Sequence, residues 1–206
     1  MVFQTHPQSI VWKNSETLWN QAIGVHPDGY CAYFSRGLYY KKQQKKELSF
    51  EDFEKSIALT PSAEALYERG LMFEEMNDLL RAEADYRNSI VLLPSNSKAH
   101  LNLGIILAKQ RKIDPAISEF KKALKYDPNY SLAHFNYATA LKFKGSFAKS
   151  LHHYDKAVEL EPKNSQYLEF RAALQASNGN LDQAINDFQK ALDLNPNNAT
   201  VHFNIA

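Results

Sequence analysis

The chain has 206 residues, of which 44% are hydrophobic, 23% are charged and seven are glycine. This composition excludes a disordered chain and disfavours an all-β protein, because apolar side chains are numerous enough to bury a core while turn glycines are few. The formal net charge of +1 gives no reason to expect a nucleic-acid partner, and a single cysteine, Cys31, excludes an internal disulfide bond.

The sequence predicts no direct membrane insertion. No apolar run approaches the ~20 residues of a transmembrane helix, and the first residues lack the basic and then apolar pattern of a signal peptide. The cytoplasm is therefore the default compartment, and an extracytoplasmic location stays open for a chain tethered to a membrane protein.

The N-terminal part predicts one helix after an irregular start. Residues 1–14 are irregular and contain an isolated Trp12. Residues 15–25 then place apolar side chains on one face of a helix that Ser15 is expected to cap, namely Leu18, Trp19, Ala22 and Ile23.

Residues 97–128 predict two amphipathic helices joined by a short turn. Apolar residues recur at helical spacing in both halves: Leu101, Ile105 and Ala108 in the first, and Ala116, Ile117, Phe120, Ala123 and Leu124 in the second. We expect Asp114 to be the N-cap of the second helix and Pro115 its first helical residue. Pro128 ends that helix, because proline lacks an amide proton and clashes within a helix.

This two-helix unit recurs along the chain. The closing prolines are 33 or 34 residues apart, at Pro27, Pro61, Pro94, Pro128, Pro162 and Pro196. We count position one of the complete units at Tyr30, Ala63, Ser97, Ser131 and Ser165. Positions eight, twenty and twenty-seven are then always small, and position twenty-four is always aromatic. Small side chains allow two helices to approach closely, and the aromatic ring fills the space beside them.

This pattern resembles the tetratricopeptide repeat (TPR) over nearly the whole chain. The resemblance implies an all-α fold, a right-handed superhelical solenoid of helix-turn-helix repeats. The expected domains are an irregular segment with one second helix (1–29), five complete repeats (about 30–62, 63–96, 97–130, 131–164 and 165–198) and the start of a further repeat (199–206). On this interpretation the chain is cut from something longer.

The turn between the two helices calls for glycine at position fifteen, where only Gly145 and Gly179 supply it. Asn77 can replace glycine because asparagine tolerates left-handed backbone angles. Gln44 and Arg111 fit less well, so we expect those two turns to differ in shape. In the fifth repeat the polar Gln175 stands at position eleven, where the family has an apolar residue, and is expected to loosen that repeat.

Residues 11–28 are similar to the tryptophan-rich linker that follows the last membrane span in relatives of the transmembrane TPR O-mannosyltransferases. That resemblance would make the chain an accessory TPR domain of a larger membrane-bound glycosyltransferase. It carries none of that family's catalytic residues into this chain.

No residue pattern predicts catalysis, a cofactor or a metal. His100, His134 and His202 share position four, but residues one repeat apart do not converge on a point. We therefore expect them to pack between helices, and we expect His152 and His153 on the solvated side. There is no nucleophile elbow and no phosphate-binding loop, so the predicted catalytic and metal sites are none.

The TPR resemblance implies a ligand groove along the first helices. Its expected lining includes Lys98, Leu101, Asn102, Phe135, Asn136 and Lys142, together with Tyr67 and Glu68 of the second repeat. The clamp that binds a chaperone's C-terminal carboxylate needs lysine at position five, and no repeat has it there. Asn102 and Asn136 at position six instead resemble the asparagine ladder of O-linked N-acetylglucosamine transferases.

Two interpretations of these asparagines stay open. An amide can donate to and accept from an extended peptide backbone, but asparagine is also a common solvated residue. The leading functional hypothesis is a non-catalytic scaffold for a protein or extended peptide. A second copy of the chain is the other possible partner, bound by self-association through the exposed ends of the solenoid. Charge differs locally, because residues 63–96 carry a net −4 and residues 97–130 a net +4.

Overall fold

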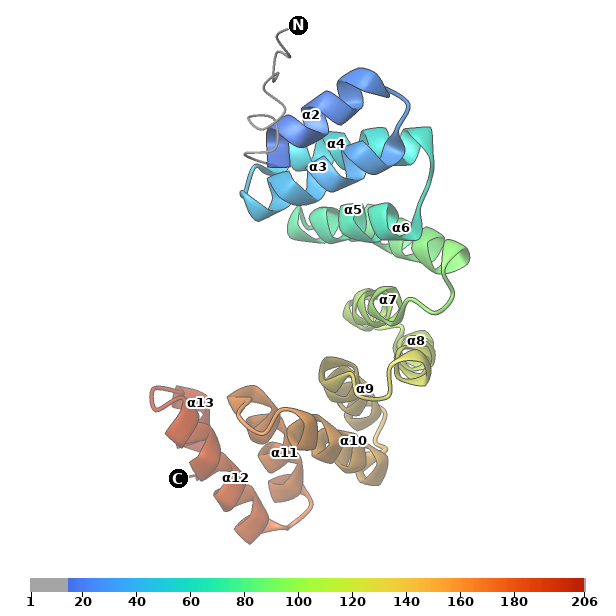
Figure 1. Ribbon diagram of the computed structural model, residues 1–206. Helices are drawn as coiled ribbons and strands as arrows, with labels where there is room; N and C mark the ends of the chain where they lie inside the picture. Colours follow the sequence, from blue (N-terminus) through green and yellow to red (C-terminus); the bar gives the residue numbers. More distant parts are fainter. Residues whose placement is uncertain (1–14, 206) are drawn as a thin grey trace, which may run out of the picture. The chain divides into compact units, whose positions relative to one another are not determined.

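The computed structural model describes residues 15–205, and every regular element in that range is an α-helix (Figure 1). The helical fold class is therefore confirmed. The prediction of an irregular segment with Trp12 falls on residues 1–14, outside the described part. None of the described helices is long and apolar enough to cross a membrane.

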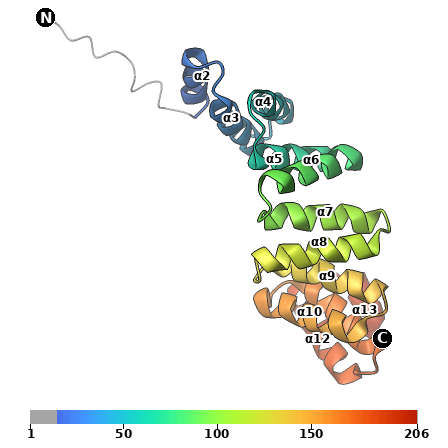
Figure 2. The ribbon, with the colours of Figure 1, turned by 90° about the vertical axis from the view of Figure 1, so that its right-hand side faces the viewer.

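The chain divides into two compact units, residues 1–94 and 95–206. The described helices of unit 1 are α2 (Ser15–Val25), α3 (Tyr30–Lys42), α4 (Lys46–Leu59), α5 (Ala63–Glu75) and α6 (Leu79–Leu92). Those of unit 2 are α7 (Ser97–Lys109), α8 (Ile113–Tyr126), α9 (Ser131–Phe143), α10 (Phe147–Leu160), α11 (Ser165–Ser177), α12 (Leu181–Leu194) and α13 (Ala199–Ile205). In Figure 2, α7, α8 and α9 of unit 2 form successive layers.

Each helix pair is held together by the position-twenty-four ring against the small residue at position eight. Phe53, Tyr86, Phe120, Tyr154 and Phe188 are all at most 2% exposed. A methyl group added to Gly104 would lie 2.6 Å from Cε1 of Phe120, and one added to Gly70 would lie 2.8 Å from Cε1 of Tyr86. The glycines therefore set how closely the first and second helices approach.

Where a small position is serine, its hydroxyl has a backbone partner. The Ser49 hydroxyl donates to the carbonyl of Gly37, and that of Ser150 donates to the carbonyl of Ala138. Both serines are fully buried. Each hydrogen bond removes the penalty of a buried hydroxyl and joins the second helix to the first.

In each of the five complete repeats, the turn between the two helices has a residue with left-handed backbone angles at position fifteen, which corrects the prediction for Gln44 and Arg111. Gln44 and Asn77 have φ of 59°, Arg111 has 62°, and Gly145 and Gly179 have 77° and 82°. The packing of the two helices determines the turn, so a side chain that disfavours this conformation still adopts it. The cost for a residue other than glycine is about 1–2 kcal/mol.

The start of α8 also differs from the prediction. The N-cap is Lys112, without a side-chain cap, and Asp114 and Pro115 are the second and third helical residues. Asp114 instead forms an ion pair with Lys144. Pro115 is tolerated because amides in the first turn have no partner within the helix. Pro128 lies two residues beyond the end of α8, as expected.

Candidate functional site

The strongest candidate surface is a strip of four polar side chains on the first helices α7 and α9 of unit 2. These helices contact each other and lie on the same side of α8 (Figure 1). We call Lys98, Asn102, Asn136 and Lys142 the α7–α9 strip. Lys98 is exposed and the other three are half-buried. Neither helix contains an acidic residue, so the strip carries the positive charges of Lys98 and Lys142 and no negative charge of its own.

The amide of Asn136 is partly engaged within its own helix. The amide nitrogen of Asn136 donates to the Leu132 carbonyl at 2.8 Å, one turn earlier in α9. Its Oδ1 then points away from that bond and remains able to accept from a ligand amide. A peptide laid along the strip would thus find an acceptor at Asn136 and cationic groups at Lys98 and Lys142.

The apolar part of the predicted groove needs correction. Leu101 is 0% exposed and Phe135 is 8% exposed, so both belong to the core. Phe135 packs against Tyr154 of its own repeat and against Tyr167 and Phe170 of α11. Both residues have the spacing expected for the groove, but the fold buries them, and in the case of Phe135 the covering residues belong to the next helix pair. The exposed large apolar residues of α9 are Leu132, at 39%, and Phe143, at 72%.

The other two predicted residues, Tyr67 and Glu68, lie on α5 in unit 1. Tyr67 is half-buried with its ring 5.8 Å from that of Tyr86. Glu68 forms an ion pair with Lys41 of α3. The predicted set is therefore divided between the two units. Its polar residues in unit 2 form the α7–α9 strip, and Tyr67 and Glu68 belong to unit 1.

A recurring arginine–aspartate pair was missed at sequence level. Arg69 donates from Nε and Nη2 to both carboxylate oxygens of Asp85, each at 2.8 Å. The same pair, sixteen residues apart, recurs as Arg36–Asp52 and Arg171–Asp187. The hydrogen bonds that Arg69 donates to Asp85 raise the pKa of Arg69 despite burial. The signal was available, because arginine at position seven and aspartate at position twenty-three occur together in these three repeats.

These arginines also reach the preceding repeat. Nη1 of Arg36 donates to Asn20 of α2, and Nη1 of Arg171 donates to Asp155 of α10 at 3.1 Å. Each guanidinium therefore connects three helices. Such planar bidentate contacts suit arginine better than lysine.

In the third and fourth repeats a histidine replaces the arginine as partner of position twenty-three. Nδ1 of His100 lies 2.6 Å from Oε2 of Glu119, and Nδ1 of His134 lies 2.9 Å from Nδ1 of His153. Burial acts to raise the pKa of Glu119, but hydrogen bonds from His100 and Lys122 outweigh it and the pKa is lowered. As expected, His100 and His134 pack between helices, but the same prediction was wrong for His202, which is exposed.

The His134 ring has a defined tautomer. Its Nε2 lies 3.0 Å from the carbonyl oxygen of Pro128, which can only accept, so Nε2 carries the proton. Nδ1 then accepts from Nδ1–H of His153. Burial lowers the pKa of His134, and burial together with His134 and His152 lowers the pKa of His153 to about 4. His153 is half-buried, so its predicted place on the solvated side was wrong, while His152 is exposed.

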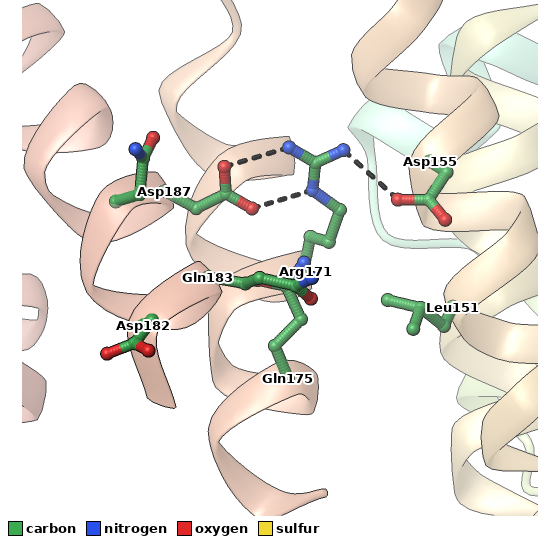
Figure 3. Close-up of a pocket in the computed structure, with 8 residues that line it drawn as sticks. Leu151, Asp155, Arg171, Gln175, Asp182, Gln183 and Asp187 are labelled. Carbon is green, nitrogen blue, oxygen red and sulfur yellow. Dashed lines mark hydrogen bonds and ion pairs between the residues drawn. The ribbon is translucent and has the colours of Figure 1, made fainter. Parts of the chain in front are cut away.

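A cavity of about 480 Å³ lies within unit 2 among α10, α11 and α12 (Figure 3). Its lining contains Leu151, Asp155, Arg171, Gln175, Asp182, Gln183, Asn186 and Asp187. The arginine–aspartate pair of the fifth repeat forms part of its wall. Among residues 15–205 no group of three or more histidine, cysteine, aspartate or glutamate side chains is placed to hold a metal ion.

Comparison with known families agrees with this architecture. Tetratricopeptide repeat models match residues 32–62, 97–130 and 119–152, and a TPR repeat model matches residues 175–206. The chain is a tetratricopeptide repeat protein. Tetratricopeptide repeat protein 6 of Homo sapiens is 30% identical over 101 residues, which are 48% of this chain and only 19% of that protein.

Solved TPR structures match the fold at low identity. The crystal structure of YrrB, described as a TPR protein with an unusual peptide-binding site, has a TM-score of 0.77 at 18% identity and covers 93% of this chain and 98% of that one. The pilF protein of Pseudomonas aeruginosa has a TM-score of 0.81 at 19% identity, covering 90% and 85%. These comparisons do not support the resemblance of residues 11–28 to transmembrane O-mannosyltransferases.

Proposed function

We propose that this TPR protein is a non-catalytic scaffold that binds an extended peptide containing acidic residues along α7 and α9. The observation that carries the proposal is the α7–α9 strip itself. Two amides at the same repeat position stand on adjacent first helices, between two lysines, on helices that contain no acidic residue.

The chemistry of the strip suits a peptide backbone with anionic side chains. Side-chain amides can pair with backbone groups whatever the peptide sequence, and Lys98 and Lys142 favour carboxylates beside that backbone. Neither lysine has an ion-pair partner among the described residues. YrrB is a fold neighbour described as having a peptide-binding site, which gives a precedent for a peptide ligand on this architecture.

Peptides selected against the intact chain would test the proposal. The double variant Asn102→Ala/Asn136→Ala removes both amides. Because one hydrogen bond contributes about 0.5–1.5 kcal/mol net, calorimetry should show binding weaker by roughly 1–3 kcal/mol. The double variant Lys98→Gln/Lys142→Gln should weaken the binding of acidic peptides more than that of neutral ones. It should also reduce the dependence of affinity on salt concentration.

The matched control is Lys121→Gln/Lys149→Gln, which removes two exposed lysines from the second helices α8 and α10. This control should keep wild-type affinity. Equal affinities for all three variants would contradict the strip and leave the asparagines as ordinary solvated residues. A selection that returned mainly basic peptides would contradict the proposed charge of the ligand.

A further inference from the structure

The cavity among α10, α11 and α12 is distinct from the α7–α9 strip and has a filled counterpart in unit 1, where the first repeat meets the second. There, Phe50 and Phe73 pack edge to face with ring centroids 5.4 Å apart. The guanidinium carbon of Arg81 lies 4.5 Å from the centroid of Phe73. The chain itself thus supplies two aromatic rings and one cation at this place in unit 1.

The fourth and fifth repeats have shorter and uncharged side chains at the same three positions. Leu151 stands where the earlier unit has Phe50, Gln175 replaces Phe73, and Gln183 replaces Arg81. These three residues line the cavity, together with acidic groups (Figure 3). The cavity therefore arises where the filling side chains, including the cation, are missing.

The charges around the cavity favour a positive ligand. Its lining contains three carboxylates, Asp155, Asp182 and Asp187, against one guanidinium, Arg171. Asp187 uses both oxygens to accept from Arg171, whereas Asp155 accepts through Oδ1 alone. Burial acts to lower the pKa of Arg171, but its bonds with Asp187 outweigh burial and the pKa is raised. The wall therefore keeps an anionic excess at Asp155 and Asp182.

Gln175 provides an independent sign that a hydrogen-bond donor is missing. The residue is only 6% exposed, and its Oε1 is buried with no partner among the described residues. An unsatisfied buried acceptor is unfavourable, and native structures contain few of them. Repeats three and four avoid the problem with Leu107 and Leu141 at the same position.

We propose that this cavity is a binding site for an arginine side chain of a partner protein. The guanidinium would occupy the place that Arg81 fills in the second repeat, beside Asp155 and Asp182. It would also supply a hydrogen-bond donor for Oε1 of Gln175. Its planar group with five N–H donors matches carboxylates and an amide oxygen at the same time.

The test uses the full chain and two small probes. N-acetyl-arginine amide is the ligand probe, and N-acetyl-citrulline amide is its neutral counterpart of the same shape. Titration followed by amide NMR should perturb α10, α11 and α12, including the side-chain amide of Gln175. The arginine probe should bind about five- to fiftyfold more tightly than the citrulline probe, because hydrogen bonds to charged groups are the stronger ones.

Two variants locate the binding. Asp155→Asn/Asp182→Asn should weaken the arginine probe about fivefold or more, whereas Asp193→Asn, an exposed change on the same α12, should leave binding unchanged. Gln175→Leu should also weaken binding while raising the unfolding temperature, because it restores the apolar residue of repeats three and four. Absence of binding, equal binding of both probes, shifts elsewhere in the chain, or wild-type affinity of the double variant would each overturn the site.

Discussion

The second repeat in unit 1 and the fourth repeat in unit 2 provide a hydrogen-bond partner for the side chain at position twenty-three with different chemistry. In the second, Asp85 accepts two hydrogen bonds from Arg69. In the fourth, His153 occupies the aspartate position and donates to His134, while Tyr137 replaces the arginine. Position twenty-three thus needs a partner in every repeat, but the partner can be a permanent cation or a neutral ring. This difference makes the two repeats respond differently to mutation and to pH.

The largest expected effect comes from removing one partner of the ionic pair. Arg69→Ala would leave Asp85, whose side chain is 5% exposed, without its counter-ion. We expect a loss of about 3–5 kcal/mol of stability, measured by urea unfolding and centred by hydrogen exchange on α5 and α6. The double variant Arg69→Met/Asp85→Leu should recover most of this loss. A small loss in the single variant would show that water reaches and solvates Asp85.

Acidification should separate the two repeats. His153 has a folded-state pKa of about 4, below the unfolded value near 6.5, so the unfolded chain binds more protons between these values. Stability is therefore fully present above about pH 6.5 and falls as pH decreases toward 4, by about 1–3 kcal/mol. The shift of His134 is in the same direction.

The relevant measurement is the urea midpoint between neutral and acidic pH. His153→Phe should flatten its pH dependence, whereas His152→Gln, at an exposed histidine, should not. Residues 63–96 contain no histidine, so protection from hydrogen exchange in the second repeat should change less. An unchanged slope in the His153 variant would mean that this imidazole is not the acid-sensitive group.

The glycine of the second repeat offers a smaller contrast. A methyl group added to Gly70 would lie 2.8 Å from Cε1 of Tyr86, whereas the fourth repeat has Ala138 at the same position and a fully buried Tyr154. Gly70→Ala gains helix propensity but forces the fully buried Tyr86 ring to shift, so we expect a net loss of about 1 kcal/mol. Thermal unfolding would measure it, with Gly24→Ala, where the added methyl meets no atom, as control. A net gain in stability would show that the ring moves freely.

The turns provide the smallest expected effect. Arg111 adopts φ of 62°, so Arg111→Gly should stabilise unit 2 by roughly 0.5–1 kcal/mol, after allowing for the larger entropy of an unfolded glycine. Asn77→Gly should gain less, because asparagine tolerates this conformation. Gly145→Ala should lower the stability by about 1 kcal/mol, because it places a side chain at a residue with left-handed backbone angles. Chemical denaturation of the three variants would rank them.

The sequence by itself determined the helices, their pairing and the family. The reason is that these properties depend on local periodicity: the closing prolines, the small positions and the aromatic position repeat every 33 or 34 residues, as the match to TPR models and structures confirms. A helix of about thirteen residues with an apolar face can be identified without knowing what covers it.

Only the tertiary structure decided which side of each helix remains open. Leu101 and Phe135 have the spacing of groove residues, yet neighbouring helices bury them. Helix packing also imposed left-handed angles on Gln44 and Arg111 against their intrinsic preference. The hydrogen bonds of Arg171 and the cavity beside Gln175 each involve residues of three helices, so the sequence of one helix cannot predict them. At these sites, the burial of a side chain and its hydrogen-bond partners depend on residues of neighbouring helices. They are therefore defined only when separate helices pack together.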